Sequence, residues 1–258
     1  MTTTTIEHAV RRAIGYMHVN LGQDLTIDDM ARTAMFSKFH FTRIFRDVTG
    51  TSPGRFLSAL RIQEAKRLLV LTDFSVADIS SQVGYCSVGT FSSRFKACVG
   101  LSPSAYRQLG GVLPKAQAVA GRPASVVRSL SLRGRVVLPP GEEPGAVFVG
   151  LFTSGVRQGW PVRWTMLDGP GSFELRDVPD GTWHILAHSV APDHDSAADS
   201  GSTGVLSVGR HGPVTVHPNA LPRPVEIELR PQDLLDPPVL LARFGGEGAG
   251  ARRAAGGA

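Results

Sequence analysis

Two cysteines, Cys86 and Cys98, are the residues of this chain best suited to redox chemistry. Their spacing is not typical of a disulfide pair or of a metal site, and thiols inside helices are usually buried. Cys86 precedes an expected helix, a position from which a thiol could sense oxidation. A small residue at a helix cap is the simpler interpretation, and we adopt it.

A group of histidines raises the question of a metal site. His184 and His188 stand four residues apart on one expected strand, and therefore on one face of it. A metal would need a third ligand and supporting hydrogen bonds around the ligands. Histidine on a strand is more often solvent-facing or hydrogen-bonded, so we predict no metal. The histidines that follow are His194, His211 and His217.

Sequence patterns of enzyme active sites are missing. The chain has no Gly-x-Ser-x-Gly motif, no glycine-rich phosphate loop and no zinc-protease helix. We therefore predict neither catalysis nor a cofactor. No apolar run approaches the roughly 20 residues that span a bilayer, and the N-terminus has no apolar signal-peptide core. These features predict a cytoplasmic protein without a membrane partner.

Positive charge is concentrated in the first part of the chain. Residues 1–110 carry 13 Lys or Arg and 8 Asp or Glu, a net charge of +5, whereas residues 111–258 carry 14 of each. A basic module joined to a neutral one is typical of a protein that binds a polyanion through one part. A merely basic surface is the alternative.

The basic part contains a sequence repeat of about fifty residues. Upstream the offset is forty-nine, because the second copy has one extra residue at the head of its second helix. Such self-similarity indicates one supersecondary unit used twice. The four repeated phenylalanines have helical spacing and are expected in the core. The pairs at offset fifty are Phe41 and Phe91, Phe45 and Phe95, Gly50 and Gly100, Ser52 and Ser102, and Pro53 and Pro103.

Each copy is expected to form two helices joined by a tight turn, which is the helix-turn-helix pattern. Ser or Thr at each start supplies an N-cap. A longer helix is expected between the copies, over residues 53–71. Its length of about 28 Å would hold the two second helices near the roughly 34 Å repeat of B-DNA. An ordinary core helix is the alternative. The four short helices are expected at residues 26–33, 37–48, 75–82 and 87–98.

The second copy carries a specific family resemblance. With its closing motifs, residues 5–109 resemble the DNA-binding module of AraC/XylS-type transcription regulators. The resemblance implies a monomeric reader of about two turns of double-stranded DNA, usually an activator that contacts RNA polymerase. The motifs are Val83-Gly84-Tyr85, Phe91-Ser92-Ser93-Arg94-Phe95-Lys96, Gly100-Leu101-Ser102-Pro103 and Tyr106-Arg107.

The resemblance implies DNA contacts from the second helix of each copy. On the first of these reading helices the base-facing positions fall at Lys38, Phe39, Thr42 and Arg43. Arg43 could bind guanine O6 and N7, and Thr42 could contact a base edge or a thymine methyl. Phe39 could stack on a sugar or a thymine methyl, and Arg46 is better placed for a phosphate.

On the second reading helix the matching positions hold small residues with few hydrogen-bonding groups. We therefore predict that the first helix supplies most base discrimination and that the second mainly docks on phosphate. The DNA-binding residues expected there are Ser87, Val88, Gly89, Ser92, Ser93 and Lys96.

Beyond about residue 130 the hydrophobic period changes from helical to alternating. Short segments separated by Pro and Gly turns predict an all-β sandwich. The sequences of residues 132–136, 147–151, 171–175 and 178–187 more distantly resemble the carboxypeptidase-regulatory or transthyretin-like β-sandwich. The expected strands are residues 131–138, 146–152, 162–167, 172–178, 182–190, 204–210, 214–217 and 225–229.

The sequence thus predicts a multi-domain α plus β protein. An all-α double helix-turn-helix module over residues 1–110 is followed by a linker at 111–130 and an all-β sandwich at 131–232. Residues 233–258 are expected to be a C-terminal segment that is mostly a disordered tail, with disorder beyond about Phe244, where the chain is rich in Gly, Ala and Arg.

Two roles stay open for the sandwich. It could sense a small-molecule effector in a cleft lined by Phe148, Trp160, Trp164 and Trp183, although aromatic residues in a sandwich are more often core. It could instead be a dimerisation or partner-binding module of a regulator that needs no ligand. The protein would then be a monomer or a homodimer.

Overall fold

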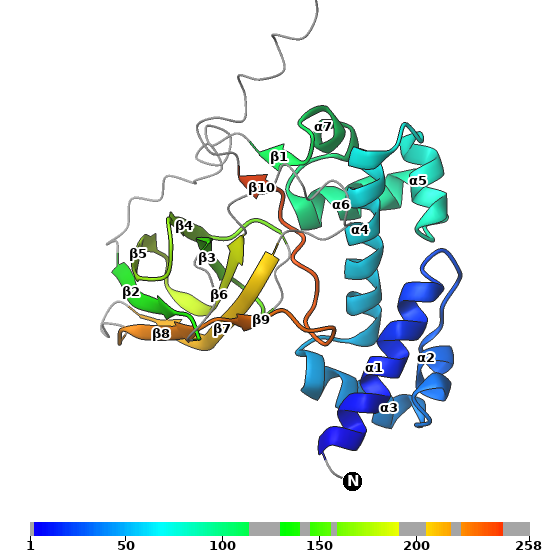
Figure 1. The fold of residues 1–258 in the computed structure, drawn as a ribbon, viewed down its shortest axis with the longest axis horizontal. Coiled ribbons are helices and arrows are strands. Elements are labelled where there is room, and N and C mark those ends of the chain that lie inside the picture. The colour runs from blue at the N-terminus through cyan, green and yellow to red at the C-terminus, as the bar shows by residue number, and fades with distance from the viewer. Residues whose placement is uncertain are drawn as a thin grey trace, which may run out of the picture.

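The computed structural model describes six ranges of the chain. Most of the expected linker and the chain beyond residue 244 lie outside them. A helical module and a β-sheet part (residues 130–231) lie side by side, with the sheets along one side of the longest helix, α4 (Pro53–Leu71) (Figure 1). The described ranges are residues 3–113, 130–139, 145–155, 159–190, 205–217 and 223–244.

The helical module contains the two predicted units. The first unit is α2 with α3 and the second is α5 with α6. Both units lie beside α4, and α1 and α7 complete the module (Figure 1). The bounds of α2, α3, α4, α5 and α6 lie within about two residues of the expected ones. The remaining helices are α1 (Thr3–Val19), α2 (Ile27–Thr33), α3 (Lys38–Thr49), α5 (Val76–Gln82), α6 (Val88–Val99) and α7 (Pro103–Gln108).

The same capping devices build both units. In α2, Thr26 accepts a hydrogen bond from the backbone N–H of Asp29, whose carboxylate accepts one in return from the backbone N–H of Thr26. Ser75 and Asp78 form the same capping box at the start of α5. The repeat therefore extends to the groups that begin α2 and α5. It does not extend to the reading helices, because Ser87 caps α6 through its hydroxyl, whereas Ser37, the expected cap of α3, makes no such hydrogen bond.

The four repeated phenylalanines are fully buried, as expected. Phe41 and Phe45 lie with ring centroids 5.4 Å apart, and Phe91 and Phe95 lie 5.7 Å apart. The first pair belongs to one apolar core and the second pair to another. Because α4 contributes buried residues to both cores, it separates the units and also joins them.

Two sheets form the β-sheet part. One has the order β5-β2-β8 and the other the order β4-β3-β6-β7-β9. Neighbouring strands are antiparallel except β2 and β8, which are parallel. The strands are β2 (Leu130–Val137), β3 (Ala146–Phe152), β4 (Arg163–Leu167), β5 (Ser172–Val178), β6 (Gly181–Val190), β7 (Val205–Val216), β8 (Val225–Glu228) and β9 (Arg230–Pro231).

The two sheets share one apolar core. Leu132 and Phe173 of the first sheet pack with Val149 and Ile185 of the second. The opposite face of the larger sheet is apolar as well. There Phe148, Phe152 and Leu186 form a separate buried cluster with Leu241 from the end of the chain.

One strand prediction is wrong. Residues 204–210 and 214–217 were expected to be two strands, separated at Gly212 and Pro213, but they form the single strand β7. Pairing with β6 continues along both halves of β7, and a register shift between Trp183 and Ile185 accommodates the irregular stretch. Extended pairing with a neighbour therefore overrides the local turn signal.

Residues 233–244, called here the C-terminal segment, are described by the structure, and the disordered tail expected beyond about Phe244 lies outside the described residues. The C-terminal segment runs back along the helical module (Figure 1). The buried Lys66 ammonium of α4 donates to the carbonyls of Val239 and Leu241, at 3.4 and 3.1 Å. Leu240 and Ala242 are buried in the core of the second unit. Burial of apolar surface here offsets the entropy cost of ordering the segment.

A short parallel pairing completes this attachment. The strand β10 (Arg243–Phe244) pairs with β1 (Val112–Leu113), which directly follows the helical module. None of the helices in the described ranges combines the length and apolarity needed to cross a lipid bilayer.

Candidate nucleic-acid interface

The first reading helix, α3, has one buried and one exposed face. Phe41, Ile44 and Phe45 point into the core of the first unit. Their three-four spacing leaves the predicted base-facing positions on the other face. Among these, Phe39 is 87% exposed. An aromatic side chain is more often buried than exposed to this degree.

The polar side chains of α3 differ in how free they are. Lys38 forms an ion pair with Asp28 at 3.0 Å, and both side chains are about half exposed. Because such surface ion pairs contribute little free energy, Lys38 can leave Asp28 for a DNA phosphate at low cost. The Thr42 hydroxyl donates to the Lys38 carbonyl at 2.9 Å. Arg43 and Arg46 are exposed, and the described residues include no ion-pair partner for either. Both guanidinium groups are available to a polyanion.

The second reading helix, α6, presents a less polar surface. The Ser87 side chain caps the helix by accepting a hydrogen bond from the backbone N–H of Thr90 at 3.4 Å. Val88, Gly89 and Ser93 are exposed, and Ser92 is half-buried. Charge appears on the exposed face only in the last turn, at Lys96. Lys96 occupies the position that Arg46 has in the first unit.

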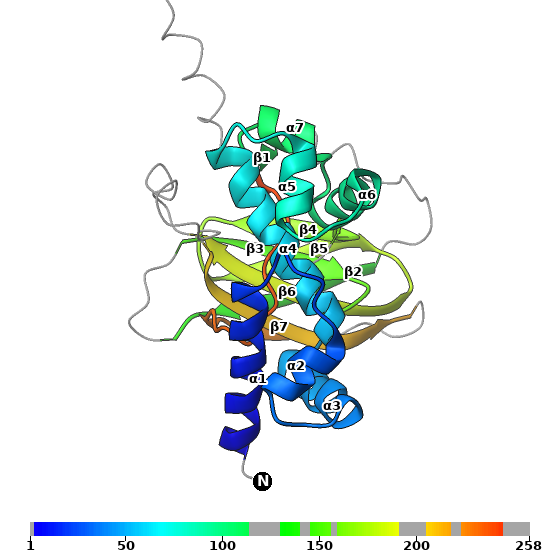
Figure 2. The ribbon, with the colours of Figure 1, turned by 90° about the vertical axis from the view of Figure 1, so that its right-hand side faces the viewer.

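Both reading helices lie on the same side of α4 (Figure 2). Figure 2 shows α3 towards one end of α4 and α6 towards the other. The nineteen residues of α4 span about 28 Å. Both reading helices therefore lie on one side of the module, and most of the residues predicted to contact DNA are exposed on them.

Side chains that the sequence did not single out help to hold the units together. Arg61 of α4 donates to the carbonyls of Leu21 and Gln23, at 2.9 and 2.6 Å, and its guanidinium lies 5.9 Å from the Tyr85 ring. Burial of Tyr85 raises the pKa of its phenol. Arg61 thus links the loop before the first unit to the turn of the second.

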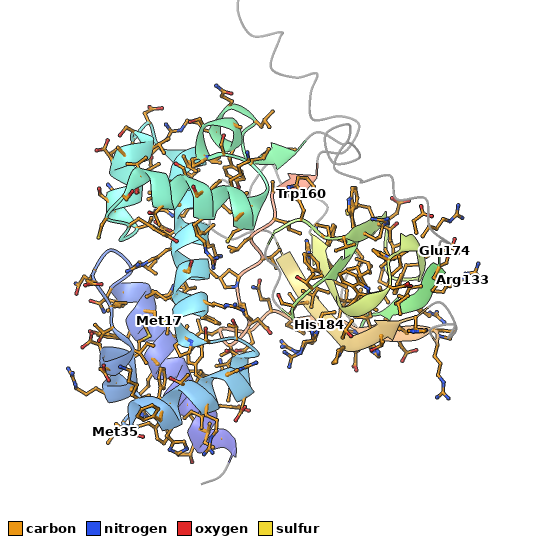
Figure 3. The ribbon with its side chains drawn as sticks, turned by 180° about the vertical axis from the view of Figure 1, so that it is seen from behind. Met17, Met35, Arg133, Trp160, Glu174 and His184 are labelled. Atoms are coloured by element: carbon orange, nitrogen blue, oxygen red, sulfur yellow. The ribbon has the colours of Figure 1, made fainter. Side chains whose placement is uncertain are left out.

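Met35 is a second residue that sequence analysis missed. It has a left-handed backbone, with φ 63°, and its side chain is 81% exposed. Figure 3 shows it on the side of the helical module away from the sheets. The repeat offset of forty-nine pairs it with Gly84, which has φ 82°. Comparison of the two copies could have revealed that Met35 occupies a glycine position.

The C-terminal ends of both reading helices contact the β-sheet part. At Gly100, which ends α6 with φ 91°, an added Cβ would lie 2.6 Å from Nε1 of Trp160. At Gly50, which ends α3 with φ 75°, it would lie 2.9 Å from Nη1 of Arg210. The β-sheet part therefore contacts the reading helices at their C-terminal ends, and most of the predicted DNA-facing residues remain exposed.

Of the four aromatic residues expected to line a ligand cleft, Phe148 and Trp164 are brought together, and Trp160 and Trp183 contact other parts of the protein. Phe148 and Trp164 stack with ring centroids 6.0 Å apart, on the face of the larger sheet that contacts the helical module. Trp183 packs against the core between the sheets and donates to the Pro179 carbonyl at 2.9 Å. Trp160 lies between the helical module and the sheets (Figure 3) and contacts Gly100. Their positions are those of packing residues.

The histidines do not assemble a metal site either. In the described ranges, no three His, Cys, Asp or Glu side chains gather closely enough to hold a metal ion. His188 is buried, with its ring 5.0 Å from that of Phe148. His194 lies outside the described residues. Cys98 is buried, which raises the pKa of its thiol, and Cys86 is exposed.

Comparison with known proteins identifies the helical module. The sequence pattern of a helix-turn-helix domain matches residues 30–109. Over 88 residues the chain is 39% identical to the HTH-type transcriptional activator AarP of Providencia stuartii, a match that covers 34% of this chain and 65% of AarP. Residues 30–109 form an AraC-type helix-turn-helix domain.

Other relatives match the AraC-type domain over a similar length. The lactose operon transcription activator of Staphylococcus xylosus is 29% identical, over 40% of this chain and 37% of its own. The MmsAB operon regulatory protein of Pseudomonas aeruginosa is 40% identical, over 36% of this chain and 30% of its own. This chain thus spans less than two thirds of the length of each relative named here.

Solved structures match the same region. The C-terminal domain of AraT, a response regulator from Geobacillus stearothermophilus, is 33% identical, with a TM-score of 0.38 over 39% of this chain and 84% of that chain. The DNA-binding domain of AdpA, a global transcriptional factor in complex with a target DNA, is 28% identical. Its TM-score is 0.37 over 45% of this chain and 97% of that chain.

Proposed function

We propose that this protein is a transcription regulator that binds double-stranded DNA through α3 and α6 of its AraC-type domain. The observation that carries the proposal is the pair of repeated units, whose reading helices lie on the same side of α4 and have exposed residues at most of the predicted DNA-facing positions. A separation of about one helical turn would let both helices enter successive major grooves on one face of a duplex.

The two reading helices have unequal roles in this proposal. Arg43 and Thr42, with Lys38 and Phe39, offer hydrogen bonds and apolar contacts to base edges, so α3 supplies most of the base discrimination. On α6 the side chains at the matching positions are short. Lys96 and the N-terminal end of α6 offer contacts to phosphate, which position the protein without reading sequence. Arg46 has the same phosphate role on α3.

The names of two relatives support activation, and not repression, as the regulatory effect. AarP and the lactose operon protein are named as activators, which supports an activator that contacts RNA polymerase. We infer that the two sheets form a β-sandwich, since they share one apolar core, and that it controls the AraC-type domain through effector sensing. A ligand-independent regulator, whose sandwich binds a partner or a second copy, is the alternative.

Selection from a pool of random duplexes tests the proposal. The full chain is the protein to use, because Leu240 and Ala242 fill part of the core of the second unit and residues 1–110 alone would lack them. We expect one enriched site of about two turns, with affinity that falls as salt rises and base preference strongest in one half. A lack of enrichment at every salt concentration would overturn the proposal.

The same experiment addresses the role of the β-sheet part. A doubled site, together with a mass that rises with protein concentration, would favour the dimerisation alternative. A single site with a constant monomeric mass would leave effector sensing as the role to pursue, for which melting temperature with and without a ligand is the direct measurement.

A further inference from the structure

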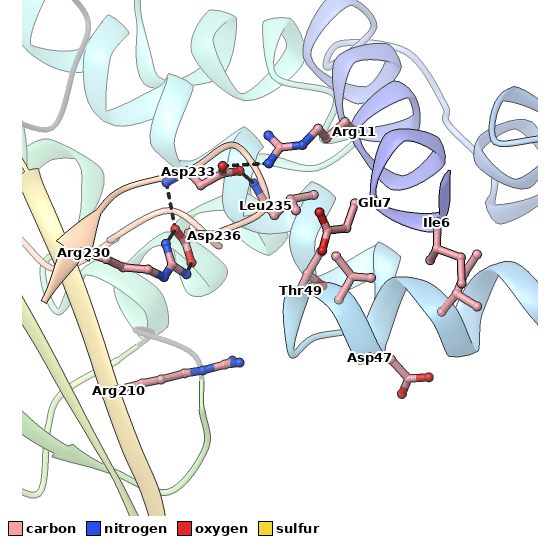
Figure 4. Close-up of a pocket in the computed structure, with 12 residues that line it drawn as sticks. Ile6, Glu7, Arg11, Asp47, Thr49, Arg210, Arg230, Asp233, Leu235 and Asp236 are labelled. Carbon is pink, nitrogen blue, oxygen red and sulfur yellow. Dashed lines mark hydrogen bonds and ion pairs between the residues drawn. The ribbon is translucent and has the colours of Figure 1, made fainter. Parts of the chain in front are cut away.

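A cavity of about 630 Å³ lies where the first unit meets the β-sheet part and the C-terminal segment. Figure 4 shows its walls, which come from α1, the C-terminal end of α3, β7, β9 and the C-terminal segment. Its volume falls in the range of about 300–1,000 Å³ that is typical of small-molecule sites. None of the four aromatic residues of the predicted cleft lines it.

Two ion pairs fix one wall of this cavity. Arg11 of α1 donates to Asp233 at 2.7 Å, and Arg230 donates to both carboxylate oxygens of Asp236 at 2.7 and 2.6 Å. The backbone N–H of Asp233 also donates to Asp236, at 2.8 Å. The hydrogen bond from Arg11 lowers the pKa of Asp233. These four side chains neutralise one another and hold the wall in place.

Three further charged side chains line the cavity without a described ion pair: Arg210 from β7, Asp47 from α3 and Glu7 from α1. Figure 4 shows the Arg210 guanidinium reaching into the space between Arg230 and Asp47. Charges of both signs therefore face the same space. The apolar part of the lining consists of Ile6, Ile44, Val48 and Leu235.

We propose that this cavity binds a small amphoteric ligand, an α-amino acid or short peptide with an apolar side chain. Arg210 can take the ligand carboxylate through paired N–H donors. Asp47 and Glu7 can accept hydrogen bonds from the ammonium group, and the aliphatic lining can cover the side chain. A ligand with only an anionic group would meet two carboxylates, and one with only a cationic group would leave Arg210 unused.

The position of the cavity gives such a ligand a route to DNA binding. Arg210 lies against Gly50, the residue that ends α3, so a ligand held between Arg210 and Asp47 would link β7 directly to the first reading helix. The corresponding junction at α6 is filled by protein, because Trp160 covers Gly100 and the backbone N–H of Gly159 donates to the Cys98 carbonyl at 3.0 Å. This coupling, unlike the binding itself, rests on the proposed function.

Binding can be tested on the full chain without DNA. L-leucine and the dipeptide Leu-Leu are the probes, with melting temperature and titration calorimetry as readouts. We expect at least one probe to raise the melting temperature. Its analogues that lack one charge, with an acetylated amino group or an amidated carboxyl group, should bind at least about tenfold more weakly. If no probe binds, or if the blocked analogues bind as well as the parent, the proposal is wrong.

Variants locate the site. Arg210→Gln and Asp47→Asn should each weaken probe binding by about tenfold or more. The matched controls are Arg223→Gln and Asp180→Asn, because both residues are exposed and neither lines the cavity. Binding that survives both cavity variants would place the ligand elsewhere and overturn the assignment.

Duplex binding by the same proteins separates the two proposals. Probe binding without any DNA site would leave this cavity assignment standing and overturn the proposed function. A DNA site without probe binding would do the reverse. If both hold, adding the probe should change duplex affinity in the wild-type protein and not in Arg210→Gln.

Discussion

The first unit presents Lys38, Phe39 and Arg43 on its reading helix, whereas the second presents Val88, Gly89 and Ser93 at the equivalent positions. The buried positions differ far less, since Phe41 and Phe45 recur as Phe91 and Phe95 in the two cores. Duplication has thus kept the packing of the unit and changed its surface. A copied fold can take on a second role when only exposed residues are replaced.

The units also differ in how they meet the sheets. At Gly100 the second unit is covered by the Trp160 indole, and the C-terminal segment enters its core. At Gly50 the first unit faces the Arg210 side chain and a cavity. The junction at Gly100 is covered by an indole that is itself 41% exposed, and the junction at Gly50 is open and charged. The two units are therefore held against the sheets by different chemistry.

The largest difference should appear when each terminal glycine is replaced by alanine. Both substitutions place a Cβ at positive φ, which costs about 1–2 kcal/mol. Gly100→Ala must in addition displace an indole 2.6 Å away, so we expect about 2–5 kcal/mol in total. At Gly50 the atom in the way is the end of a flexible arginine, and the cost should stay near the strain alone. Urea unfolding measures both, and equal costs would show that the two junctions are alike.

Base reading provides the next contrast. Arg43→Ala should lose about 1–3 kcal/mol at the selected site and relax base preference in one half of it. Ser93→Ala, its counterpart in the second unit, should change little. Titration of both variants against the selected duplex and single-base variants of it measures the difference. Similar losses of specificity would mean that the reading roles are wrongly assigned.

The turns of the two units should respond with opposite sign. Met35→Gly removes a non-glycine residue from a left-handed position and should stabilise the protein by about 1 kcal/mol. Gly84→Ala should destabilise it, because the new Cβ would lie 2.6 Å from the Leu21 carbonyl oxygen and 2.7 Å from Nη2 of Arg61. Thermal unfolding reports both. A destabilised Met35→Gly variant would show that the methionine side chain makes a contact that outweighs the strain.

Phosphate docking is where the units should behave alike. Arg46→Ala and Lys96→Ala remove basic residues at equivalent positions in the last turns of α3 and α6. Each should reduce the slope of log affinity against log salt by about 1, with little change in base preference. A changed slope for one variant only would mean that a single unit docks on the backbone.

The helical module was predictable because its signals are local. Caps such as Thr26 and Ser75, the glycine after each reading helix and the spacing of the phenylalanines lie within a few residues of the elements they define. The exposed faces of α3 and α6 followed from the same period. Pairing the two copies would also have located the strained turn at Met35.

The contacts between distant parts were not predictable. The stretch from Asp233 to Ala242 has neither helical nor alternating periodicity, so nothing in it announces that Lys66 and the core of the second unit receive it. The cavity depends on Arg11, Asp47 and Arg210, which come from three separated elements. Aromatic residues such as Trp160 suggested a cleft because a sequence shows the type of each residue. It does not show which residues each of them contacts in the fold.

The return of the C-terminal segment to α4 has a consequence for how the chain is joined. The C-terminal end of the β-sheet part is attached to the helical module without a covalent bond, through the pairing of β1 with β10 and through the hydrogen bonds from Lys66. The covalent connection over residues 114–129 is then not the only tie. A chain cut there should remain a single complex, and its two fragments, produced separately, should reassemble when mixed.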